Sequence, residues 1–184
     1  MKASRSFSFE KLKRGELGIS SVGGAYLAEA AEFCLQHHSH LKPVLIHLTG
    51  HLRDSASLEW GEHIDAKSLS RTHGDLKRAV EDGAYGIAIV LATGTTGIPS
   101  AMKSPQSTGF DYWLTSGDER NFFEARLEVS GLLKGNQAEI AQREKKKIKT
   151  TGRSDDTQLP AYIFIVEFGA PEARIMKRVP GEGH

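Results

Sequence analysis

The sequence predicts an α/β protein, with a central mixed β-sheet flanked by helices, in a single domain over residues 1–184. Segments with apolar residues at helical spacing are interspersed along the chain with short apolar or alternating runs that are typical of strands. A length of 184 residues suits one hydrophobic core. The composition, 39% hydrophobic and 26% charged, is that of an ordinary globular protein and excludes disordered and fibrous classes.

No segment indicates export or membrane insertion. The longest apolar runs, 43–48 and 85–92, are far shorter than the ~20 residues that a membrane-spanning helix needs. The first residues lack the apolar core of a signal peptide. We therefore expect a cytoplasmic protein without membrane contact.

The N-terminal part is expected to contain an arm, a helix and a strand. Residues 1–22 are basic and rich in Ser and Gly, which predicts a loosely held arm. Residues 25–38 carry a helical stripe made of Leu27, Ala31, Cys34, Leu35 and His38. Cys34, the only cysteine, is thus expected in the core rather than as a reactive thiol. Pro43 ends any continuation of the helix, and residues 44–48 have the apolar run of a buried strand.

The middle of the chain is expected to contain a helix and a central strand. Residues 49–71 are polar and predict irregular structure. Thr72, followed three residues later by Asp75, is a capping signal for a helix that Gly83 would end. Residues 85–92 are apolar on both faces, which predicts a buried central strand. The Gly- and Thr-rich residues 93–108 predict a loop.

The last third predicts a hairpin, a helix and further strands. Residues 109–114 and 124–130 alternate in polarity and are separated by a polar stretch, as in a β-hairpin. Asn136 with Glu139 is a capping signal for a helix that runs to about residue 149. Residues 161–168 give the strongest strand signal, and residues 173–179 a weaker one. From residue 72 the expected order is therefore helix, three strands, helix, strand.

Two acids of the expected hairpin come close together. Alternation places Phe110, Tyr112 and Leu114 on one face with Leu127 and Val129, and Asp111 and Trp113 on the other face with Arg126, Glu128 and Ser130. A symmetric turn puts Asp111 opposite Glu128, with Cβ atoms ~5 Å apart. Two carboxylates at this distance repel each other, and together they suit a hard cation such as Mg²⁺.

The segment 72–168 resembles the PD-(D/E)XK, or restriction-endonuclease-like, superfamily. Its αβββαβ core carries an Asp on the second strand and a (D/E)-x-K motif on the third, and the matching stretches here are GFDYWL with Asp111 and ARLEVSG with Glu128. The resemblance implies a nuclease-like core preceded by an N-terminal helix and strand. It also implies a metal-dependent endonuclease whose Mg²⁺ or Mn²⁺ is held by Asp111 and Glu128, with Glu81 assisting from the first helix. Implied partners are DNA and an ATPase or helicase subunit. A homodimer is a further expected assembly.

One residue departs from the family's motif. Ser130 occupies the position of the motif lysine, which stabilises charge or activates water in the family. We expect a replacement cation from Lys134, just beyond the strand, or from a basic residue of the following helix. The alternative is a decayed metal site, in which case the protein is a non-catalytic subunit that binds DNA or a partner protein.

A basic run lies on the helix after the hairpin. Because the formal net charge is only +1, attraction to nucleic acid must come from a local patch. The run can contact phosphates, although such runs are also typical of a solvated helix face, and it consists of Arg143, Lys145, Lys146, Lys147, Lys149 and Arg153.

Three further interpretations remain open at this stage. Asp111, Arg126 and Glu128 can form an ionic ladder on a solvated hairpin face. A transition-metal site is a second interpretation, from the histidines His37, His38, His40, His47 and His51. The third is an unrelated α/β enzyme that binds a nucleotide through residues 93–97, although this loop lacks the Lys-Ser/Thr of a P-loop.

Overall fold

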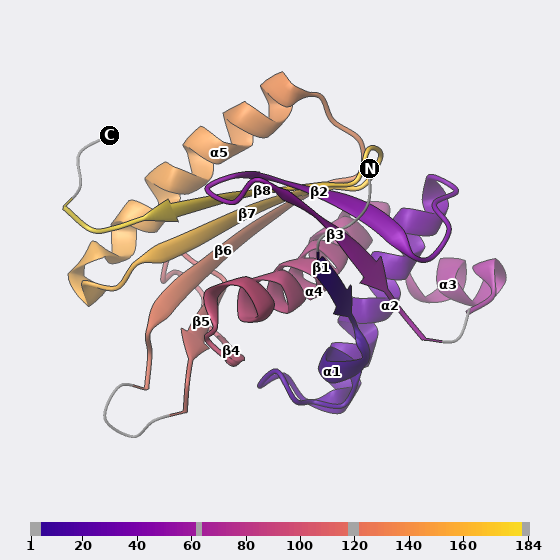
Figure 1. The fold of residues 1–184 in the computed structure, drawn as a ribbon, viewed down its shortest axis with the longest axis horizontal. Coiled ribbons are helices and arrows are strands. Elements are labelled where there is room, and N and C mark those ends of the chain that lie inside the picture. The colour runs from indigo at the N-terminus through magenta and orange to yellow at the C-terminus, as the bar shows by residue number, and fades with distance from the viewer. Residues whose placement is uncertain (1–4, 62–63, 118–121, 182–184) are drawn as a thin grey trace.

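The computed structural model describes residues 5–61, 64–117 and 122–181, and it has the expected α/β fold with one mixed sheet flanked by helices (Figure 1). The eight strands follow the order β1-β3-β2-β8-β7-β6-β5-β4. They are β1 (Arg5–Ser8), β2 (Val44–Gly50), β3 (Asp54–Glu59), β4 (Ser100–Lys103), β5 (Tyr112–Thr115), β6 (Ala125–Leu132), β7 (Ala161–Glu167) and β8 (Glu172–Arg178). The helices are α1 (Glu10–Lys13), α2 (Ser21–His37), α3 (Ala66–Thr72), α4 (Leu76–Thr96), α5 (Gln137–Thr151) and the 3-10 helix η1 (Gly152–Thr157).

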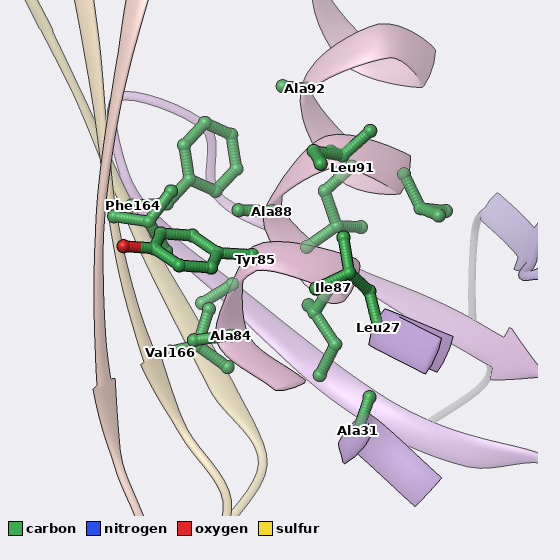
Figure 2. Packing of buried hydrophobic residues seen from close by; sticks show 14 of the residues in the cluster. Leu27, Ala31, Ala84, Tyr85, Ile87, Ala88, Leu91, Ala92, Phe164 and Val166 are labelled. Atoms are coloured by element: carbon green, nitrogen blue, oxygen red, sulfur yellow. The ribbon is translucent and has the colours of Figure 1, made fainter. Parts of the chain in front are cut away.

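The helices form layers on both faces of the sheet. α5 covers β6 and β7 from one face, and α4 covers them from the other, with α2 packed against α4 on its far side (Figure 1). Figure 2 shows this core: the side of α4 that faces the sheet meets Phe164 and Val166 of β7, and its opposite side meets Leu27 and Ala31 of α2. Cys34 is fully buried in this core, as expected, and burial raises the pKa of its thiol to about 12.

Residues 85–92 are part of a helix, so the prediction of a central strand there was wrong. α4 starts after Asp75, whose side chain accepts the amides of Lys77 and Arg78, and it continues to Thr96. A helix that is apolar on all sides is stable only when both sides are covered, and α4 lies between the sheet and α2. Gly83 does not end this helix. A Cβ at Gly83 would lie 3.0 Å from the α2 backbone, so this glycine allows the two helices to approach closely. None of the helices in the described ranges combines the length and apolar character needed to cross a membrane.

Two segments that the sequence suggested were irregular are ordered. Residues 5–22 belong to the fold rather than to a loose arm, because β1 pairs parallel with β3 and Phe9 and Leu12 are fully buried. Residues 49–71 contain β3 and α3. In β3 the buried positions include Ser55 and Ala56, whose small side chains give a weak strand signal in the sequence.

The order from α4 to β7 is helix, three strands, helix, strand. β4, β5 and β6 pair antiparallel, and β7 joins β6 in parallel. This is the order expected from the sequence, but its first strand is β4, at Ser100–Lys103, inside the stretch expected to be a loop. The hairpin of β5 and β6 is confirmed as antiparallel, and it places the candidate site.

Candidate functional site

Asp111 lies where β5 separates from β6. Tyr112 pairs with Leu127, and the Leu127 carbonyl also accepts the amide N–H of Asp111 at 2.9 Å, so the backbone bulges at Asp111. The Val129 amide donates to Asp111 Oδ2 at 2.9 Å. The carboxylate therefore takes the place of the next backbone acceptor and is fixed beside Glu128.

The two faces of the hairpin follow the expected alternation with one exception. Tyr112, Leu114, Leu127 and Val129 lie in the main core, which α4 covers. Phe110 does not join them, because its ring meets Trp113 edge-on at 4.4 Å. The bulge at Asp111 accounts for this shift, since it interrupts the alternation of side chains before β5.

Glu128 is a buried acid with a cation on one side and an acid on the other. Burial and the charge of Asp111 raise the pKa of Glu128 to about 7, and the ammonium of Lys147, which donates a hydrogen bond to Glu128 Oε1, opposes this rise. The geometry therefore brings Asp111 and Glu128 together, as the sequence predicted. The repulsion between them is only partly relieved.

Glu81 joins the site through a tyrosine. The hydroxyl of Tyr85 lies 2.9 Å from Asp111 Oδ1 and 3.0 Å from Glu81 Oε1, and its single proton serves one of them at a time. Burial, with Asp111 and Glu81 nearby, raises the pKa of Tyr85, which keeps this hydroxyl a donor. A continuous chain of side chains results: Glu81, Tyr85, Asp111, Glu128 and Lys147.

The cation beside Glu128 comes from α5 and not from Lys134. Lys147 contacts Glu128, and one turn earlier Arg143 donates a 2.9 Å hydrogen bond to the Ser130 hydroxyl. Lys134 follows the far end of β6, where its stem packs beside Gly169. Leu132, the last residue of β6, is already ~13 Å along the strand from Glu128. Two sources were expected for a cation in place of the motif lysine, Lys134 and the following helix. The cation that contacts Glu128 comes from the helix.

A groove of about 1080 Å³ runs from this site along β6. It is bounded by the first turns of α4, by the part of β6 beyond Glu128 and by α5. Three of the five α5 residues expected to bind nucleic acid line it, namely Arg143, Lys146 and Lys147. Lys145 and Lys149 are exposed outside the lining.

The residues present fit a magnesium-like ion better than a transition metal. Mg²⁺ keeps several waters in proteins and is bound by one or two carboxylates together with substrate phosphates, which matches Asp111 and Glu128. In the described part of the chain, no group of three His, Cys, Asp or Glu side chains could hold a metal. The expected histidine site is therefore not found there. His38 and His40 instead contact backbone carbonyls of Leu133, Phe168 and Gly169.

The ionic-ladder interpretation of Asp111, Arg126 and Glu128 was wrong. Arg126 is fully buried, and its guanidinium bonds Asp155, Ser154 Oγ and the carbonyls of Thr151 and Leu159. Arg126 therefore anchors η1 against β6. The hairpin face that carries it is buried rather than solvated.

Residues 93–97 form no nucleotide-binding loop, so that interpretation was wrong as well. They are the last turn of α4 and its cap. The hydroxyls of Thr93, Thr95 and Thr96 bond carbonyls four residues earlier in the helix. These hydroxyls are therefore engaged within the helix itself.

Tyr85 is the site residue that sequence reasoning missed. It was assigned to a strand, where no relation to Glu81 is apparent. On a helix, residues four apart are neighbours, so the spacing of Glu81 and Tyr85 would have placed both on the side facing the hairpin. The signal was present but was concealed by the wrong assignment of α4.

Comparisons of the chain with models of protein families, with curated proteins and with solved structures find no match. The resemblance noted in the sequence therefore depends on the residues and the order of elements described above.

Proposed function

We propose that this protein is a cytoplasmic, Mg²⁺- or Mn²⁺-dependent nuclease that hydrolyses phosphodiester bonds of DNA, and that it is a divergent relative of the PD-(D/E)XK superfamily. The observation that carries the proposal is the chain of side chains from Glu81 through Tyr85, Asp111 and Glu128 to Lys147. These residues belong to the segment from α4 to β7, in which a helix is followed by three antiparallel strands, a helix and a parallel strand. The lysine that the motif lacks at Ser130 is supplied by Lys147.

Each of these five side chains has a distinct role in this proposal. Asp111 and Glu128 hold the divalent ion, and Glu128 must lose its proton to do so. When bound, the ion neutralises charge on the scissile phosphate and lowers the pKa of the attacking water. Lys147, beside Glu128, stabilises the charge that develops on the phosphate. Tyr85 positions the Asp111 carboxylate, and Glu81 in turn accepts from the same hydroxyl.

Cleavage of DNA with and without divalent ions tests the proposal. We expect Mn²⁺- and Mg²⁺-dependent cleavage by the wild type, and its loss in Asp111→Asn and Glu128→Gln. Glu59→Gln is the control, since this exposed acid ends β3 near the opposite edge of the sheet. If the wild type cleaves no DNA with either ion, alone or with natural partners, or if both site variants cleave as it does, the nuclease proposal is wrong.

A second candidate is a non-catalytic subunit of the same fold that binds DNA or a partner protein. The observation in its favour is Ser130, whose hydroxyl accepts from Arg143 where the family has a catalytic lysine. Calorimetric titration with Mn²⁺ separates the candidates, because a decayed site would bind no ion and a nuclease would bind one that Asp111→Asn abolishes.

A further inference from the structure

The edge of β6 beyond Glu128 is open on the side of β5. β5 pairs with β6 only from Tyr112–Leu114 to Ala125–Leu127, and in the described ranges no other strand continues along that edge. The groove occupies this position, between α4 on one face and α5 on the other. An extended chain can therefore lie along β6 and lead directly to the two carboxylates.

The lining of this groove is predominantly positive. The acids in the lining are Glu81 and Glu139. The cations are more numerous: Lys77, Lys134, Arg143, Lys146 and Lys147. Glu139 is already engaged at the start of α5, where its carboxylate accepts the amide of Asn136. A backbone of phosphates has the charge complementary to this lining.

An aromatic cluster lies at the other end of the site. Its rings belong to Phe110, Trp113, Phe122 and Phe123. Trp113 stacks on Phe123 with ring centroids 4.2 Å apart, and Phe122 meets Phe123 edge-on at 4.8 Å. Trp113 pairs with Arg126, two residues or ~7 Å along β6 from Glu128. Phe122, 45% exposed, is the most accessible of these rings to a ligand.

From these two features we infer that the substrate is single-stranded DNA, with its phosphates along the groove and unpaired bases against the aromatic cluster. This inference rests on the proposed function, because it names the substrate of the same site. Proteins that bind single strands combine a cationic groove with aromatic rings on which bases stack. In a duplex the bases are stacked on one another and cannot reach Phe122.

Binding measured in a chelator, without divalent ions, tests the inference separately from cleavage. The probes are a labelled oligothymidylate of about twelve nucleotides, its counterpart with abasic spacers, and a blunt hairpin duplex. We expect the oligothymidylate to bind more tightly than the duplex. Phe122→Ala should raise its Kd about 5-fold or more, the effect of losing one stacked base. Leu41→Ala, which removes another exposed apolar side chain outside the groove lining and the aromatic cluster, should leave the Kd unchanged.

The abasic probe identifies what Phe122 contacts. If a base stacks on its ring, removing the bases weakens binding by the wild type, and Phe122→Ala has no further effect on the abasic probe. Duplex binding equal to or tighter than that of oligothymidylate would overturn the inference, as would equal effects of Phe122→Ala on both single strands. Preference for the single strand without metal-dependent cleavage would reject the nuclease proposal, and single-stranded DNA would then be a ligand of the groove rather than a substrate.

Discussion

Two pairs of acids come together in the sheet, one on β7 and β8 and the other at the hairpin of β5 and β6, and their surroundings differ. On β7 and β8, Glu167 pairs directly with Glu172. On the hairpin, Asp111 lies beside Glu128. Glu128, Glu167 and Glu172 are each less than a tenth exposed, so burial alone does not distinguish the two regions.

The two regions differ in the donors that surround each carboxylate. Glu167 accepts three backbone amides, from Gly135, Gly169 and Ala170, at 2.7 to 3.1 Å. Glu172 accepts from the Thr49 hydroxyl and the Gln137 side-chain amide, both at 2.7 Å, and the Arg174 guanidinium lies 3.6 Å from its Oε1. These donors, most of them neutral, are part of the fold itself and hold a loop and a helix start in place. This pair is therefore structural.

In the described part of the chain, Asp111 and Glu128 together accept from fewer neutral donors than Glu167 and Glu172 do. Asp111 accepts one backbone amide and faces the Tyr85 hydroxyl, whereas Glu128 meets Lys147 and the charge of Asp111. Two acids therefore lie side by side next to an open groove, and the pKa of Glu128 is raised. A buried pair of acids thus indicates function where the surrounding donors leave charge uncompensated, and the following predictions test that distinction.

The largest expected effect concerns the cation beside Glu128. Lys147→Ala should lower metal-dependent DNA cleavage by about 10²- to 10³-fold, the usual loss when one group that stabilises developing charge is removed. Lys134→Ala, at the far end of the same groove, should change the rate of cleavage by less than about 10-fold. Single-turnover rates with saturating Mn²⁺ measure both. A larger loss from Lys134→Ala than from Lys147→Ala would contradict the site as described.

Replacing one acid in each pair by its amide should change stability in opposite directions. Glu167→Gln places an NH₂ group or a weaker acceptor opposite three amide donors, so it should destabilise the protein by about 1–3 kcal/mol at every pH where the fold is stable. Glu128→Gln removes a buried charge beside Asp111. It should stabilise the protein at about pH 8 by on the order of 1–2 kcal/mol. Urea denaturation of both variants measures the difference.

The pH dependence of the Glu128→Gln effect follows from its raised pKa. Between the ordinary pKa of 4.5 and the folded-state value of about 7, the folded protein binds more protons than the unfolded chain. The stability of the wild type therefore falls as pH rises through this window. Glu128→Gln has no such proton to lose. Its greater stability relative to the wild type should therefore disappear towards about pH 5. An advantage that is constant from pH 5 to about 8 would mean that the carboxyl is not the cause.

The sequence predicted the hairpin because strand alternation is a local pattern that the fold preserved within β5 and β6, and Asp111 lies beside Glu128 although a bulge interrupts the alternation there. It could not predict that α4 is a helix, since an apolar stretch such as 85–92 suits a central strand and a helix buried on both sides equally well. The presence of α2, which covers α4, decides between them, and that is a tertiary contact. The order of elements came out as expected only because β4 replaced the misassigned strand.

The residue that replaces the motif lysine could not be predicted from the sequence, for a related reason. Spacing along the chain favoured Lys134, four residues after Ser130. The register of α5 over β6 instead places Arg143 above Ser130 and Lys147 above Glu128, and this register is set by packing between elements. Local patterns therefore predicted the acids, and only the packed structure identified the cation.

Mn²⁺ should bind at Asp111 and Glu128 and not at the Glu167–Glu172 pair, and its affinity should depend on pH. Ion binding requires an ionised Glu128. With a pKa of about 7, only about a tenth of the Glu128 carboxyl groups are ionised at about pH 6. The gain in stability from Mn²⁺ should thus be about 1 kcal/mol smaller at about pH 6 than at about pH 8, or a few degrees in Tm. Thermal denaturation with and without Mn²⁺ measures this gain. Glu167→Gln should retain it, and a gain that also persists in Asp111→Asn would place the ion elsewhere.

The smallest expected effect separates the two sides of α5. Residues three and four apart on a helix share a side, which sets Arg143, Lys146 and Lys147 towards the groove and Lys145 and Lys149 away from it. Lys146 has no role in holding the acids, so its substitution reports phosphate contact alone.

Lys146→Ala should weaken binding of oligothymidylate a few-fold and reduce the slope of log Kd against log salt by about 0.7, the value for one phosphate contact on a single strand. Lys145→Ala removes the same charge from the adjacent position on the helix, but outside the groove. It should therefore leave the slope nearly unchanged, because a side chain held in solvent releases no counterion when DNA binds. Titrations at several salt concentrations without divalent ions give both slopes. Equal reductions in the two variants would mean that α5 attracts DNA through its total charge, and that the groove beside Glu128 does not guide the strand.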